Sequence, residues 1–230
     1  MINHEMIFPK MNKKTDTNPF SKSRVIFVNG TKGSGKSTLV MNLLMLIEKE
    51  QDIEEEDALY FSGNCKDPLL KALSFPVTDK ASELEDFILR VRNNNDDKKR
   101  FVLVLDDCQS NPNVKVMNAR SSDFTNFVLS SRHYKVTIIV TAQTFANSFS
   151  PVFKGNVDMF FIFQPKTKKE NDNIINFFDE TEKIDRALKL LKLKNEQAER
   201  DKEHKTFLYI NLIGAQPQYF LGFKDKLNNL

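Results

Sequence analysis

The chain has 230 residues, with 34 Lys and Arg against 31 Asp and Glu and a formal net charge of +3. Its length fits one large domain better than two very small ones, and 40% hydrophobic with 28% charged residues is typical of a globular chain rather than a disordered one. The nearly balanced charge neither demands nor excludes a polyanionic partner, because a local basic patch can lie within a neutral total.

The two cysteines, Cys65 and Cys108, form no CxxC motif and no framework of pairs. They indicate a reduced intracellular compartment and speak against a disulfide scaffold or a structural zinc site. No apolar run approaches the roughly 18 residues that span a bilayer, so no membrane span is expected. Residues 1–22 are rich in Asn, Lys and Thr and lack the apolar segment of a signal peptide, which predicts a flexible polar arm.

Apolar, β-branched runs predict strands along the chain, and apolar residues at helical spacing predict helices between them. We expect the acidic run 48–57 to be a solvated turn, and Ser82 with Glu85 to form a capping box at a helix start. The predicted strands are 24–29, 58–62, 101–105, 136–141, 157–163, 207–212 and a final edge strand at 219–223. The predicted helices are one that starts at Lys36, one with an apolar stripe over 84–91, 122–133 and 181–194.

Strands that alternate with helices predict right-handed βαβ units and therefore an α/β three-layer sandwich with a mostly parallel central sheet. Ligands of such sheets bind beyond the carboxyl ends of the strands. One domain is expected over residues 23–230, with the chemistry-bearing motifs in 24–163 and an α/β extension over 164–230.

Three of the seven glycines, Gly30, Gly33 and Gly35, fall in one short loop between the first predicted strand and the first predicted helix. This loop matches G-x-x-x-x-G-K-[ST] in full, a pattern in which glycines let successive backbone N–H groups point at phosphate oxygens. The helix N-terminus adds positive potential. The residues expected to bind nucleotide are Gly30, Thr31, Lys32, Gly33, Ser34, Gly35, Lys36, Ser37 and Thr38.

Within this loop, Lys36 is expected to reach the β and γ phosphates, and the Ser37 hydroxyl to coordinate Mg²⁺. The strand at 101–105 ends in two adjacent acids, Asp106 and Asp107. Carboxylates at a strand's carboxyl end beside a phosphate loop suit metal binding and water activation. We expect Asp106 to hold the metal and Asp107 to deprotonate the attacking water.

The next strand ends at Gln143, whose amide can contact the γ phosphate or the water and report hydrolysis to the rest of the domain. A whole strand unit lies between the phosphate loop and the acid strand, which is the order of motor-type ATPases rather than of most nucleotide kinases. A GTPase would also carry N-K-x-D and, after the acid strand, D-x-x-G; neither motif is present.

Taken together, these motifs resemble the poxvirus-type genome-packaging ATPases of large DNA viruses, virophages and related tailless viruses, within the FtsK–HerA superfamily of P-loop ATPases. The resemblance runs from about residue 24 to 163. The specific part is the Arg-His stretch that precedes the Gln strand. The matching segments are the phosphate loop, Val-Leu-Asp-Asp-Cys at 104–108, Ser-Arg-His-Tyr at 131–134, the strand 136–143, Asn-Val-Asp at 156–158 and 160–163.

This resemblance implies a ring-forming, RecA/FtsK-like ATPase, pentameric or hexameric, that uses ATP and Mg²⁺ to pump double-stranded DNA into a preformed capsid. It also implies an arginine that completes the neighbouring subunit's site, for which Arg132 matches and Arg120 is a second candidate. The expected partners are DNA bound without sequence preference and a capsid or portal vertex. The expected location is the host cytoplasm or viral factory, or the virion itself. Many motor ATPases carry Glu where this chain has Asp107.

Two segments are candidates for DNA contact: the polar loop 108–122, with Lys115 and Arg120 and no acid, and the lysine cluster at 166–169. An ordinary surface loop explains the first segment equally well, and a lysine cluster such as the second is most often merely solvated. Two other functions stay open, a nucleotide kinase and a nucleotide-gated DNA-loading or assembly protein.

Overall fold

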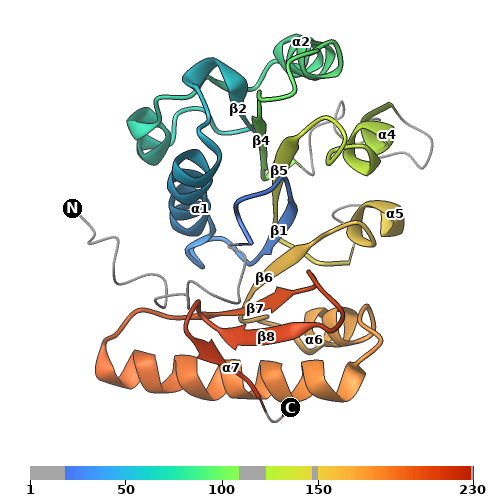
Figure 1. The fold of residues 1–230 in the computed structure, drawn as a ribbon. Coiled ribbons are helices and arrows are strands. Elements are labelled where there is room, and N and C mark those ends of the chain that lie inside the picture. Colours follow the sequence, from blue (N-terminus) through green and yellow to red (C-terminus); the bar gives the residue numbers. More distant parts are fainter. Residues whose placement is uncertain (1–18, 109–122, 147–149, 229) are drawn as a thin grey trace.

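The computed structural model describes residues 19–108, 123–146, 150–228 and 230. Their centre is one nine-stranded sheet with the strand order β3-β2-β4-β5-β1-β6-β7-β8-β9 (Figure 1). The strands from β3 to β6 in this order are parallel, whereas β7, β8 and β9 join as antiparallel neighbours. The sheet is therefore mostly parallel, and the strands of the C-terminal region extend it beyond β6.

The elements follow the predicted strand and helix pattern closely. The strands are β1 Val25–Asn29, β2 Ala58–Ser62, β3 Val77–Thr78, β4 Phe101–Asp106, β5 Val136–Ala142, β6 Met159–Phe163, β7 Phe207–Asn211, β8 Gln218–Leu221 and β9 Asp225–Lys226. The helices are α1 Lys36–Gln51, α2 Ala81–Arg92, α4 Asp123–Leu129, α5 Pro151–Lys154, α6 Lys168–Ile175 and α7 Thr181–Asp201, with short 3-10 turns η2 Glu55–Asp57 and η3 Pro68–Ala72.

Both faces of the sheet are covered, because the parallel strands are mostly apolar and are buried at nearly every position. In β1, Val25 and Phe27 face one core and Ile26 and Val28 face the other. The first core is closed by α2, α4 and α7, and the second by α1 (Figure 1). This confirms the predicted α/β three-layer sandwich. None of the described helices is long and apolar enough to cross a membrane.

Several local expectations were wrong. The acidic run 48–57 is only in part a solvated turn, because α1 continues to Gln51 and because both Gln51 and Asp57 are buried. The capping box at Ser82 does not form: α2 begins at Ala81, and Lys80 at its N-cap makes no side-chain cap bond. The helix expected over 122–133 ends at Leu129. β8 is not the edge strand, because β9 pairs outside it.

Gln51 shows why α1 runs on into the acidic segment. Its side-chain amide donates to the carbonyl oxygens of Phe20 at 2.7 Å and Lys22 at 3.0 Å, and its oxygen accepts from the Thr137 hydroxyl at 3.2 Å. The end of α1 thereby fixes the segment that leads into β1, which in turn leads to the phosphate loop.

We predict that Gln51→Leu, a change of similar size, lowers the free energy of unfolding by about 1–3 kcal/mol, because it leaves the carbonyl groups of Phe20 and Lys22, the first of them buried, without this donor. Chemical denaturation of the purified protein measures the change. Glu50→Ala, at the exposed neighbouring position, serves as the control and should shift stability far less. Equal stability of Gln51→Leu and the unchanged protein would show that this amide is dispensable.

Candidate active site

The phosphate loop connects the end of β1 to the start of α1, where the sequence places it. Gly33 and Gly35 have φ of 77° and 101°, in the left-handed region that favours glycine, and Gly35 is the N-cap of α1. α1 begins at Lys36 with no side-chain cap, so the N–H groups of its first turn lack a capping side chain. An anion is the natural partner of such a helix start.

Gly30 has a different reason to be glycine. A β-carbon at this position would lie 2.5 Å from the Ser34 hydroxyl oxygen and 2.9 Å from Cβ of Phe163, the last residue of β6. At Gly35 a β-carbon would lie 3.5 Å from the Phe163 ring. Phe163 therefore packs directly beneath the loop and fixes how closely the backbone curls.

Lys36 is 6% exposed, and its ammonium donates to the carbonyl oxygen of Gly30 at 2.8 Å and of Thr31 at 3.4 Å. It also lies 3.9 Å from Oδ2 of Asp107. The loop lysine after β1 and the second acid after β4 thus approach each other at the carboxyl end of β5, the strand between them. A phosphate oxygen at this point would find a cation already in place.

The two acids are held by one hydroxyl group that the sequence analysis did not single out. Thr141, on β5 and fully buried, donates to Oδ1 of Asp106 at 2.7 Å and accepts the backbone N–H of Asp107 at 2.9 Å. Asp107 itself has φ of 47°, a left-handed conformation that costs a non-glycine residue about 1–3 kcal/mol. Thr141 therefore stabilises the conformation that turns Asp107 toward the phosphate loop.

Gln143 completes the group. Its amide nitrogen donates to Oδ2 of Asp107 at 3.1 Å, and its side chain is exposed. The structure therefore brings together Lys36, Asp106, Asp107 and Gln143 at the carboxyl edge of the sheet. Burial raises the pKa of Asp106, the charge of Asp107 raises it further, and the hydrogen bond from Thr141 lowers it.

The residues present fit a nucleoside triphosphate and a magnesium ion. Oδ1 of Asp107 and the hydroxyl of Ser34 are buried and have no hydrogen-bond partner among the described residues. Both polar atoms belong to the predicted site, one at the acid strand and one in the phosphate loop. Ser37 and Asp106 offer hard oxygen ligands of the kind that Mg²⁺ prefers.

The segment that follows Gln143 is clamped by residues beyond the predicted motifs. The buried ammonium of Lys154, on α5, donates to the carbonyl oxygens of Phe145 at 2.8 Å and Ala146 at 3.0 Å. The Phe145 N–H donates to the carboxylate of Glu170 on α6. Burial lowers the pKa of Lys154. The segment directly after Gln143 is therefore hydrogen-bonded to both α5 and α6.

Arg132 lies apart from these residues. It pairs with Asp158, which is 5% exposed and precedes β6, and whose Oδ2 accepts the Val25 N–H at 2.9 Å. Asp158 and Val25 mark the amino ends of β6 and β1, whereas the phosphate loop follows the carboxyl end of β1. The Arg132 side chain remains 68% exposed. Arg120 and the loop 109–122, with Lys115, lie outside the described residues.

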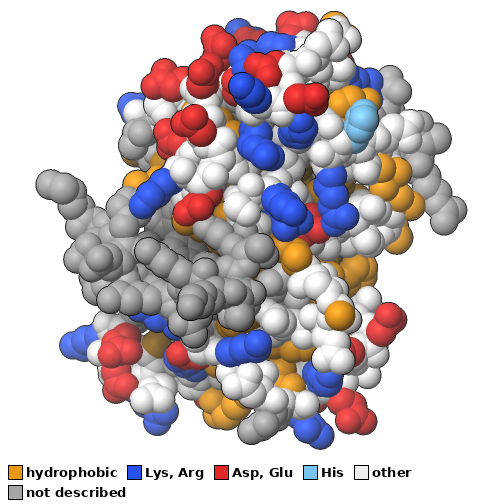
Figure 2. All heavy atoms as spheres, in the orientation of Figure 1, with side chains coloured by type: hydrophobic (Ala, Val, Ile, Leu, Met, Phe, Trp, Pro, Cys, Tyr) orange, Lys and Arg blue, Asp and Glu red, His pale blue; other side chains and the backbone are white. Residues whose placement is uncertain are grey.

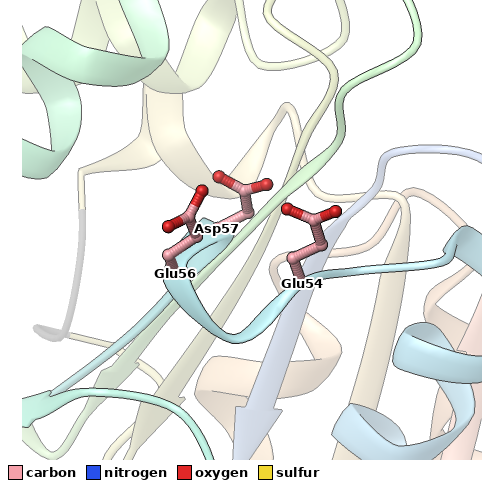
Figure 3. A group of neighbouring side chains, drawn as sticks. All are labelled: Glu54, Glu56 and Asp57. Carbon is pink, nitrogen blue, oxygen red and sulfur yellow. The ribbon is translucent and has the colours of Figure 1, made fainter.

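Charged side chains elsewhere give no single basic field on the face that Figure 2 shows, where acidic and basic groups are intermixed. One acidic group stands out among the described residues: Glu54, Glu56 and Asp57 at η2 (Figure 3). Lys99 lies 3.3 Å from Glu56 and 3.1 Å from Asp57, so an ammonium already offsets part of this charge.

No protein-family model and no curated protein sequence matches this chain. Its structure resembles the genome-packaging NTPase B204 from Sulfolobus turreted icosahedral virus 2 in complex with ATPγS, with a TM-score of 0.57 at 14% identity, covering 88% of this chain and 98% of that chain. The DNA-packaging ATPase B204 from Sulfolobus turreted icosahedral virus matches equally well, with a TM-score of 0.57 at 14% identity over 88% of this chain and 98% of that chain.

The pCW3 conjugation coupling protein TcpA, solved with ATPγS, matches with a TM-score of 0.54 at 15% identity over 90% of this chain and 62% of that chain. At such identities a likeness establishes the fold. The chain therefore has an α/β fold that matches these P-loop NTPases, and the predicted resemblance is confirmed at the level of fold.

We predict that Gly30→Ala weakens ATP binding by about tenfold or more, because overpacking of this kind costs about 1–3 kcal/mol in a loop that must keep its shape. Equilibrium titration with ATP measures the effect. Gly63→Ala is the matched control, since a β-carbon at Gly63 meets nothing within 4 Å. Equal losses in the two variants would contradict the proposed fit.

Removal of the Thr141 hydroxyl tests the bridge between the acids. We predict that Thr141→Val lowers kcat for ATP hydrolysis about 10- to 100-fold with a much smaller change in KM, the scale expected when a positioning contact is lost. Thr141→Ser, which keeps the hydroxyl, should restore most of the rate. If valine and serine act alike, the hydroxyl does not position the acids.

Proposed function

We propose that this protein is a Mg²⁺-dependent ATPase that translocates double-stranded DNA, and that it packages a viral genome into a preformed capsid. The observation that carries the ATPase part is the convergence of Lys36, Asp107 and Gln143, from three elements, beside a complete phosphate loop. The likeness to B204 supports the packaging part, since that protein is described as a genome-packaging NTPase.

The chain's own residues divide the work of hydrolysis. The Lys36 ammonium exchanges its carbonyl partners for β and γ phosphate oxygens, while Asp107 accepts a proton from the attacking water. The water oxygen bonds to the γ phosphorus, the bond to the bridging oxygen breaks, and ADP and phosphate leave. Ser37 and Asp106 would hold Mg²⁺, which would supply positive charge to offset the charge of the phosphates.

Gln143 orients the water through its bond to Asp107 and senses the loss of the γ phosphate. Because the segment after Gln143 is held by Lys154 and Glu170, this change reaches α5 and α6. We assign to Arg132 a role in the neighbouring subunit's site within a pentameric or hexameric ring, and its exposure at the opposite edge of the sheet supports this assignment. DNA is gripped through phosphates, and a ring multiplies modest basic patches.

The ATPase rate with increasing double-stranded DNA, with assembly state recorded in parallel, tests this function. We expect DNA to raise the rate, and added salt to reduce that stimulation, since phosphate contacts release counterions. A ring that hydrolyses ATP at a rate unchanged by DNA, even with capsid vertex components present, would contradict translocation. Transfer of phosphate to a nucleoside monophosphate would instead indicate a kinase.

Asp107→Asn separates a motor from a nucleotide-gated loader. We predict that this variant retains ATP binding and loses turnover by about 10²- to 10⁴-fold, the contribution of a general base. Titration with ATP and phosphate release measure the two properties. A protein that uses ATP only to set a conformation would keep its DNA-loading activity in this variant, whereas a motor would lose translocation along with turnover.

A further inference from the structure

The order of the strands determines which way a bound nucleotide would run along the carboxyl edge of the sheet. Asp107 and Gln143 follow β4 and β5, which lie on one side of β1, whereas β6, β7 and β8 lie on its other side (Figure 1). A γ phosphate that reaches Lys36, Asp107 and Gln143 must lie toward β5. The nucleoside at the other end of the phosphate chain must then extend over the ends of β6 and its neighbours.

Three phenylalanines occupy that side of the phosphate loop, and we call them the aromatic shelf: Phe163, Phe207 and Phe223. Phe163 is 5% exposed and lies against Gly30 and Gly35. Phe207, the first residue of β7, pairs with Phe163 in the sheet, and their ring centroids are 5.6 Å apart. The shelf thus begins directly beneath the loop.

The shelf continues through the turn between β8 and β9. Gly222 has φ of 63°, and its N–H donates to the Phe207 carbonyl oxygen at 2.8 Å. This turn sets the Phe223 ring 5.1 Å from the Phe207 ring. Phe207 and Phe223 are both partly exposed, whereas the rings one row deeper in the sheet, Phe161 and Tyr209, are buried and stacked on each other.

From this arrangement we infer that the aromatic shelf binds the nucleobase of the nucleotide whose phosphates lie on residues 30–38. The inference rests on the proposed ATPase function and adds the part of the site that holds the base. Aromatic faces stack on any base, and alanine substitution at such contacts typically costs about tenfold in affinity or more. The shelf therefore predicts that ATP and GTP bind with similar affinity.

Competition for a fluorescent ribose-labelled ATP tests the shelf, with ATP and inorganic tripolyphosphate as competitors. Phe223→Ala should weaken ATP about tenfold and leave tripolyphosphate unchanged, because only ATP carries a base. Phe207→Ala should act in the same direction. Phe223→Leu keeps apolar bulk without the ring and should also lose ATP affinity, which separates stacking from folding.

Phe220→Ala is the matched control, because Phe220 is a half-buried ring on β8 that stacks on Tyr209, one row farther from the loop. It should leave both competitors unchanged. An unaltered ratio of ATP to tripolyphosphate affinity in the Phe223 and Phe207 variants overturns the shelf and leaves the ATPase proposal intact. A wild-type protein that binds neither competitor nor probe overturns both.

Discussion

The parallel pairing of β1 with β5 on one side and β6 on the other is the constraint on which the site depends. It aligns the carboxyl ends of these strands, so the glycine loop after β1 lies between Gln143 and Phe163. The pairing of β5 with β4 then brings the two acids within reach. Each of these strands is buried on both faces, and the two hydrophobic cores therefore hold the edge in place from either side.

Thr141 holds both acids of the site in position. A single hydroxyl both donates to Asp106 and accepts from the backbone of Asp107, whose left-handed conformation would otherwise be unsupported. The clamp on Phe145 by Lys154 and Glu170 works in the same way on the segment after Gln143. These hydrogen bonds fix the positions of the motif residues, and they connect the site to α5 and α6.

The phosphate loop, the acid pair and most strands could be predicted because each carries a local pattern: closely placed glycines, or an apolar run that ends in a polar residue. Thr141 was missed because a threonine inside a β-branched strand has the same local pattern whether it packs or bonds. The sequence did not predict four short elements: β3, β9, α5 and α6. Two-residue strands and short helices hold too few residues to show an apolar periodicity. The buried Gln51 and Asp57 escaped prediction because tertiary contacts, absent from the local sequence, decide whether an acidic segment is solvated.

We propose that the carboxyl edge of β4, β5 and β1 binds the terminal phosphate of ATP. A crystal structure with a non-hydrolysable ATP analogue and Mg²⁺ tests it most directly. We expect a γ phosphate within hydrogen-bond distance, about 3 Å, of the Lys36 ammonium, with Asp107 and Gln143 facing it. A triphosphate bound elsewhere on the sheet, or one whose γ phosphate points toward β6, would contradict it.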